Sequence, residues 1–145
     1  ANKHNSVLFF HINAPRIEQE GQSVLKNLRS LFKDTDHKLV EHSWLPREQF
    51  LLLILAMDCG MQVSLNESFN IVTADFVKMG VPIVVSESID WMPSSAKVST
   101  EETSEIVRGL ENLITHPFGA VKLSRKYLAD YNKRAIKAWC KFLYN

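Results

Sequence analysis

One segment near the middle of the chain limits the fold more than any other. A short apolar strand is expected over residues 61–65, followed by a polar turn that carries Glu67. The turn leads into a helix expected over residues 69–79, which ends at Gly80, and a second buried strand is expected over 83–85. This order predicts a β-α-β unit, in which two parallel strands are joined by a right-handed helical crossover.

Strand-like and helix-like segments alternate along the rest of the chain as well. Short runs rich in β-branched and aromatic residues indicate strands, and apolar residues spaced by three and four indicate helices. Further strands are expected over 7–12 and 37–43 with a short one at 97–98, and further helices over about 17–32, 47–57, 100–116 and 120–143. The alternation predicts the α/β class with a doubly wound, mainly parallel, Rossmann-like sheet. Because no linker rich in Pro, Gly or Ser divides the chain, residues 1–145 are expected to form a single domain.

A local signal marks the start of the helix that precedes Pro117. Residues 99–102 read Ser-Thr-Glu-Glu. This pattern is typical of a capping box, in which the first side chain caps the helix and the acid three positions later reaches back. We therefore expect Ser99 to be the N-cap and Glu102 its partner.

Composition excludes several classes of protein. The chain has 145 residues and a formal net charge of +1, so its overall charge does not indicate binding to nucleic acid. Its two cysteines, Cys59 and Cys140, are far apart and match no metal-binding spacing, which indicates reduced thiols in a cytoplasmic protein. No apolar run reaches the length of a membrane span. The chain begins at Ala1 rather than Met, which indicates processing or excision from a longer protein.

Two acids in the β-α-β unit are candidates for ligand binding. Glu67 lies where the first strand ends, and Asp75 follows eight residues later inside the helix. Helical side chains tilt toward the helix N-terminus, so both carboxylates are expected near the same edge of the sheet. The amides at the helix start can bind phosphate oxygens there, and a nearby carboxylate suits the paired hydroxyls of a ribose. Alternatively, both are surface acids, with Glu67 complementing the helix dipole. The spacing alone does not choose between the two.

The same residues resemble the E-x7-E region of retaining glycosyltransferases of the GT-B fold, in their C-terminal, donor-binding domain. Residues 64–70 read Ser-Leu-Asn-Glu-Ser-Phe-Asn, Asp75 stands at the second acidic position, and residues 80–86 read Gly-Val-Pro-Ile-Val-Val-Ser. The resemblance extends to Trp-Leu-Pro at 44–46 and to the long C-terminal helix, and so covers almost the whole chain.

The resemblance implies specific roles for these residues. Glu67 would lie beside the donor sugar as the catalytic carboxylate, and Asp75 would hold the ribose of the nucleotide. The backbone amides of Phe69, Asn70 and Ile71 at the helix start would bind the diphosphate. Arg16 and Trp44 would complete the donor-binding set. The substrate would be a nucleotide-diphosphate sugar, transferred with retention and without a metal or other cofactor. An N-terminal acceptor domain or partner chain would supply the rest of the cleft.

The chain also departs from the family pattern around the expected diphosphate. Aligned on Gly21, Pro15 occupies the position of the usual Arg, with Arg16 one residue away, and Glu20 occupies that of the usual Lys. An acid beside a diphosphate opposes its binding. These departures leave open a second hypothesis, a degenerate noncatalytic domain kept for assembly or protein contact. A third is a flavodoxin-like signalling or nucleotide-binding domain, since a fold alone does not fix a function.

The C-terminal helix carries a separate charge signal. After Gly119 the chain has seven basic residues and one acid, Asp130. A basic amphipathic helix can lie on an anionic membrane surface, which would make the protein peripheral at the membrane. The alternative is a solvated basic face over residues packed in the core, among them Leu128, Tyr131, Ala135 and Trp139.

Overall fold

The computed structural model describes residues 6–13 and 19–144 and has a mixed α/β fold. Its described residues form five α-helices and two small sheets, and every strand pair is parallel. The predicted α/β class and the parallel pairing are therefore confirmed. The chain divides into two compact units, Ala1–Glu48 and Gln49–Asn145, which are described one at a time below.

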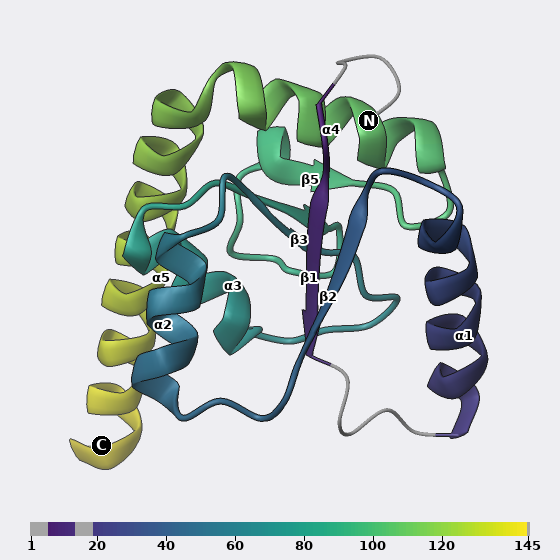
Figure 1. The fold of residues 1–145 in the computed structure, drawn as a ribbon. Coiled ribbons are helices and arrows are strands. Elements are labelled where there is room, and N and C mark those ends of the chain that lie inside the picture. The colour runs from purple at the N-terminus through teal and green to yellow at the C-terminus, as the bar shows by residue number, and fades with distance from the viewer. Residues whose placement is uncertain (1–5, 14–18, 145) are drawn as a thin grey trace. The chain divides into compact units, whose positions relative to one another are not determined.

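The first unit contains a two-stranded sheet and one helix. Strands β1 (Phe9–Asn13) and β2 (Lys38–His42) run parallel, with Phe9 opposite Lys38, and helix α1 (Gln19–Lys33) makes the crossover (Figure 1). The rings of Phe10 and Phe32 stack with their centroids 6.0 Å apart, which joins the helix to the sheet. This unit is a complete β-α-β element of the kind that the alternating pattern predicts.

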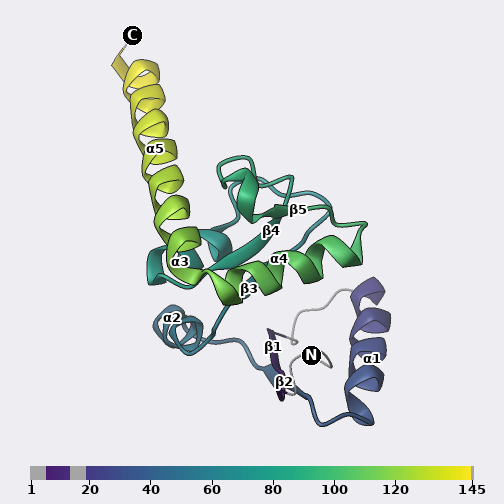
Figure 2. The same ribbon diagram turned by 90° about the horizontal axis from the view of Figure 1, so that it is seen from above.

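The second unit is built around the sheet of the central segment. The boundary between the units falls within α2 (Arg47–Leu55). The elements that follow are β3 (Gly60–Gln62), α3 (Ile71–Met79), β4 (Ile83–Ser86), a short 3-10 helix η1 (Ser94–Ala96), β5 (Lys97–Val98), α4 (Thr103–Thr115) and α5 (Pro117–Tyr144). The strands pair in the order β3-β4-β5 (Figure 2), so the expected short strand at 97–98 is confirmed.

The central strand β4 is buried on both faces, as in sheets covered by helices on either side. Ile83 and Val85 face a cluster that includes Val77 of α3 together with Leu128 and Tyr131 of α5. The residue between them, Val84, packs instead with Val98 and with residues of α4 such as Leu113. The near-continuous apolar run of β4 is therefore explained by helices on both sides of this sheet.

The end of α3 agrees with the prediction from sequence. Gly80 closes the helix in the left-handed conformation, with φ of 82°, and its N–H donates to carbonyls of the last turn. Arg125 of α5 donates to the carbonyl oxygens of Val77 and Lys78 at 3.1 Å each. A cation at a helix C-terminus is favourable because the free carbonyls there carry partial negative charge.

The predicted capping box before α4 is wrong. The N-cap is Glu102, whose side chain makes no capping hydrogen bond, and the helix begins at Thr103. The side chain of Glu105 instead accepts a hydrogen bond from the backbone N–H of Ser99 at 3.1 Å. The Ser99 hydroxyl oxygen accepts a hydrogen bond from the N–H of Glu101 at 3.3 Å, so Ser99 belongs to a turn that comes before the helix.

Three further outcomes concern the larger organisation. The described strands form two separate hydrogen-bonded sheets, so the single doubly wound sheet and the single domain over residues 1–145 stay predictions. The long C-terminal helix expected over 120–143 is confirmed and spans Pro117–Tyr144. Within residues 6–13 and 19–144, no helix combines the length and the apolar content needed to cross a bilayer.

Candidate functional site

A polar pocket lies at the carboxyl edge of the β3-β4-β5 sheet. It has a volume of about 280 Å³ and is lined by residues at or just beyond the carboxyl end of each of the three strands. These are Ser64, Leu65, Ser86, Glu87, Ser88, Ser99, Thr100 and Glu101. In open parallel sheets, the carboxyl ends of the strands form the edge where ligands bind. Because hydroxyl groups dominate the lining, the pocket can exchange hydrogen bonds with a hydroxylated ligand.

Glu67 is held beside this pocket by the end of β3. Its Oε1 accepts hydrogen bonds from Ser64 Oγ at 3.0 Å and from Gln62 Nε2 at 3.3 Å, and Gln62 Nε2 also donates to Ser64 Oγ at 2.9 Å. The carboxylate is half-buried and connects to the pocket through Ser64, which lines it. Two hydrogen-bond donors, Gln62 of β3 and Ser64 of the loop after it, therefore orient the Glu67 carboxylate, which stays partly exposed to solvent.

At the end of β4, a pair of hydroxyls that lines the pocket is fixed in place. Ser86, at the end of β4, is buried, and its Oγ lies 2.7 Å from Ser88 Oγ. A hydroxyl offers one donor and two acceptor positions, so this pair satisfies one hydrogen bond and keeps others for a ligand or water. Sequence reasoning missed both serines, although their position directly after a predicted buried strand was a usable signal.

The helix expected to begin at Phe69 begins at Ile71 instead. Asn70 is the N-cap, with φ of 55°, and its Oδ1 accepts a hydrogen bond from the N–H of Thr73 at 2.8 Å. Asn is among the few side chains that tolerate positive φ and also cap a helix. Among the described residues, the N–H groups of Phe69, Asn70, Ile71 and Val72 show no hydrogen bond to a protein acceptor, so an anion at the helix start could use these amides, Ile71 and Val72 being the two that lie in the helix itself.

Replacing Asn70 tests whether its cap holds this helix start. Asn70→Ala removes the capping oxygen and places a Cβ-bearing residue without local hydrogen bonding at positive φ, so we expect a loss of about 1–2 kcal/mol in the free energy of unfolding. Asn70→Gly keeps the backbone conformation accessible and should cost only a few tenths. Urea unfolding followed by circular dichroism measures both. Equal losses for the two variants would contradict a role of the positive φ, and an unchanged stability of Asn70→Ala would contradict a role of the cap.

Phe69 serves packing rather than ligand contact through its side chain. Its ring stacks on Trp91 and on Tyr131, with centroids 5.5 Å and 5.4 Å away, and its carbonyl oxygen accepts a hydrogen bond from Trp91 Nε1. This explains the late helix start, because the Phe69 carbonyl is bonded to an indole and its ring is directed into the core. Trp91 was not predicted as part of the site, although a Trp in a polar loop needs both a buried ring and a partner for its N–H.

Asp75 is buried on α3, with 4% of its surface exposed. The alternative in which it is a solvated surface acid is therefore wrong for this residue. A buried carboxylate needs hydrogen-bond partners. Glu67 is half-buried and bonded to Gln62 and Ser64, and no contact joins it to Asp75 in the described part of the chain.

The other predicted donor-binding residues belong to the first unit or fall outside the described residues. Arg16, like Pro15, falls outside the described residues. Trp44 belongs to the first unit, where it is exposed in the connection between β2 and α2. Glu20 lies in the first turn of α1, also in the first unit. The structure thus groups Glu67, Phe69 and Asn70 in one loop, with Ile71 and Asp75 in the helix that follows it.

Two other kinds of site, a cysteine nucleophile and a metal centre, find little support among the described residues. Burial raises the pKa of the Cys59 thiol and the charge of Asp58 raises it further, which disfavours the thiolate that a cysteine nucleophile requires. No group of three His, Cys, Asp or Glu side chains suited to a metal ion occurs within the residues that the structure describes.

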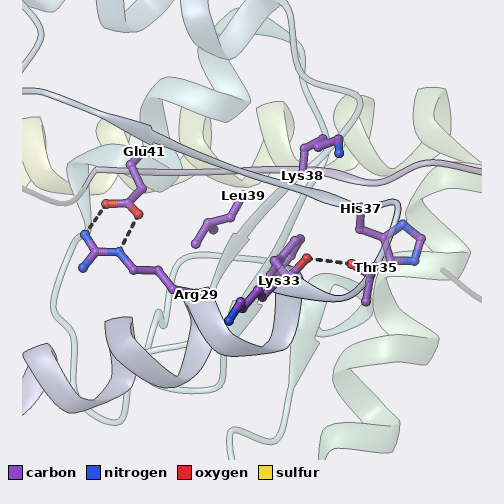
Figure 3. A pocket seen from close by; sticks show the side chains of 8 residues that line it. Arg29, Lys33, Thr35, His37, Lys38, Leu39 and Glu41 are labelled. Atoms are coloured by element: carbon purple, nitrogen blue, oxygen red, sulfur yellow. Dashed lines mark hydrogen bonds and ion pairs between the residues drawn. The ribbon is translucent and has the colours of Figure 1, made fainter.

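The first unit has a larger hollow of about 440 Å³ between α1 and β2 (Figure 3). Arg29 and Glu41 close one side through two hydrogen bonds of 2.7 Å and 2.6 Å, and this contact lowers the pKa of the Glu41 carboxyl. Lys33, Thr35 and His37 lie at the opposite side, around the end of α1 and the start of β2. The hollow therefore runs along most of β2, from Lys38 to Glu41, rather than across the carboxyl ends of the strands, where parallel sheets bind ligands.

Comparisons of the chain with protein-family models, with curated proteins and with solved structures found no match. The class of protein is therefore defined by its fold and its polar pocket alone, as an α/β protein with a hydroxyl-lined pocket at the carboxyl edge of a parallel sheet.

Proposed function

We propose that this chain is the donor-binding half of a retaining GT-B glycosyltransferase, with its two units forming one doubly wound Rossmann-like architecture. The observation that carries the proposal is the hydroxyl-lined pocket at the carboxyl ends of β3, β4 and β5, next to an oriented carboxylate at Glu67. A nucleotide-diphosphate sugar would place its sugar hydroxyls against this lining and its diphosphate at the amides of Ile71 and Val72.

Within this proposal each residue has a stated role. Glu67 is the carboxylate beside the donor sugar, and Asp75 holds the ribose from within α3. Arg16 and Trp44 contribute contacts to the diphosphate and the nucleobase. The reaction needs no metal or other cofactor, takes place in the cytoplasm and is completed by an N-terminal acceptor domain or partner chain.

The second candidate is a degenerate domain without catalysis. Two observations favour it: Asp75 is buried at 4% exposure, and the side chain of Asn70 already accepts a hydrogen bond at the helix start, where a phosphate would bind. A domain of this kind would retain the fold and bind no nucleotide.

Calorimetry of the full chain with UDP, GDP and ADP separates the two candidates. The donor-binding function requires heat from at least one diphosphate at millimolar concentration or below. Asp75→Asn should then weaken nucleotide binding by about 1–3 kcal/mol, or roughly five- to 150-fold, because a charged hydrogen bond is worth that much. Asp130→Asn, on an exposed position of α5, is the matched control and should change nothing.

A second comparison tests the division of roles. Glu67→Gln should weaken binding of the full sugar nucleotide more than binding of the bare nucleotide, since Glu67 is assigned to the sugar. Absence of heat from all three diphosphates would favour the degenerate domain. Equal losses for both ligands in both variants would refute the assigned roles.

A further inference from the structure

Helix α5 has two halves with different surroundings. In the first half Ser124 is buried, and Leu128 and Tyr131 pack against the core of the second unit. Beyond Tyr131, every residue up to Tyr144 is exposed except Ala135, which is half-buried. Figure 2 shows this part of the helix extending past the other elements of its unit. The residues from 132 to 144, here called the distal half, therefore have no packing role in that unit.

The distal half divides into an apolar and a basic face. At about 100° per residue, its apolar side chains share one side of the helix. These side chains are Ala135, Ile136, Trp139, Phe142 and Leu143. Its basic side chains fill a separate, adjoining sector of the circumference, and they are Lys133, Arg134, Lys137 and Lys141. No acid occurs between positions 132 and 144.

The apolar face is large and almost bare. Trp139 is 63% exposed and Phe142 77% exposed, and their rings meet edge to face with centroids 6.0 Å apart. The alternative in which Trp139 packs in the core is therefore wrong. A bare aromatic strip of this kind needs a partner that offers an apolar layer.

The charges identify the kind of partner. Four cations beside the strip, with no acid among them, require negative charge next to the apolar layer. A second copy of the helix would bring like charges together without a compensating acid. The surface of an anionic bilayer meets both needs, because the apolar face enters the boundary of the acyl chains while Lys and Arg reach the headgroups.

We propose that the distal half of α5 binds the surface of an anionic lipid bilayer and holds the protein there peripherally. The inference does not depend on the donor-binding function, since it uses neither the pocket nor the residues around Glu67. It also explains why a helix that needs only its first half for packing continues as an ordered, exposed segment with two distinct faces.

Cosedimentation of the full chain with vesicles tests the proposal. Binding to vesicles that contain phosphatidylserine should be at least tenfold tighter than binding to pure phosphatidylcholine vesicles, and added salt should weaken it. Lys133→Glu with Lys137→Glu should reduce binding at least tenfold. The matched control is Lys122→Glu with Lys126→Glu, the same charge change on exposed positions of the first half, which should have a much smaller effect.

A second variant tests the apolar face. Trp139→Ser with Phe142→Ser should also reduce vesicle binding at least tenfold, while circular dichroism and the thermal midpoint stay unchanged because both side chains are exposed. The proposal is overturned if neither vesicle binds, or if the two lysine pairs have equal effects. It is also overturned if the apolar variant abolishes a dimer in size-exclusion chromatography and leaves vesicle binding intact, since the face would then join two copies.

Discussion

Trp91→Ala is expected to lower the free energy of unfolding by about 3–5 kcal/mol, the usual cost of removing a large buried aromatic side chain. Trp91 is 3% exposed and belongs to the cluster that covers β4. The substitution removes its stacking on Phe69 and leaves the Phe69 carbonyl without its donor. Because that carbonyl directly precedes the cap of α3, the loss should also loosen the loop that carries Glu67.

Two further variants separate the contributions of Trp91. Trp91→Phe keeps an aromatic ring and removes the indole N–H, so it should cost about 1–3 kcal/mol for the unsatisfied acceptor and the smaller ring. Trp139→Ala changes an exposed residue of the same type and should stay within about 0.5 kcal/mol. Urea unfolding followed by far-UV circular dichroism gives all three values. A loss for Trp91→Ala no larger than that for Trp139→Ala would contradict the role assigned to Trp91.

Gly60→Ala is expected to destabilise the protein by about 1–3 kcal/mol through overpacking. Gly60 is buried at the start of β3, and a Cβ there would lie 2.5, 2.7 and 2.9 Å from Cε1, Cδ1 and Cζ of Phe76. Phe76 is packed against the core cluster of α3 and β4, so its ring cannot simply move away. The absent side chain of Gly60 is thus what allows α3 to lie this close to β3.

A smaller side chain at position 76 should relieve the same clash. In a Phe76→Leu background the smaller side chain leaves room, so Gly60→Ala should cost less there, and a double-mutant cycle measures the difference. Gly119→Ala is the control, because a Cβ at that position in α5 meets nothing within 4 Å. It should be neutral or stabilising, since alanine favours helix. Additive losses for Gly60→Ala and Phe76→Leu would show that the two residues do not compete for space.

Much of the second unit follows from its sequence. The strand at 83–85, the helix end at Gly80, the short strand at 97–98 and the long C-terminal helix were all predicted, because each depends on local properties. An apolar run, a glycine at positive φ and a regular spacing of apolar residues act over a few residues and need no knowledge of distant ones. The position of Glu67 after a parallel strand belongs to the same group.

Other features depended on contacts between residues that are distant in sequence. Helix α3 begins at Ile71 and not at the predicted Phe69, because Trp91, 22 residues away, donates a hydrogen bond to the Phe69 carbonyl oxygen. The predicted Ser99 cap is wrong because, beyond the pairing of β5 with β4, the Ser99 N–H donates to the side chain of Glu105 and its hydroxyl oxygen accepts from the N–H of Glu101, which places Ser99 in a turn before the helix. No local pattern encodes these pairings, since they arise only when the strands and helices are assembled.

The sequence by itself therefore determined the element types, their order and the edge of the sheet where polar groups gather. The tertiary structure alone decided which of those groups are accessible. Asp75 and Trp139 show this most clearly. Asp75 is charged and yet buried, a state that its residue type and its place in the sequence pattern do not indicate. Trp139 is apolar and yet exposed, because α5 continues beyond the core that its first half covers.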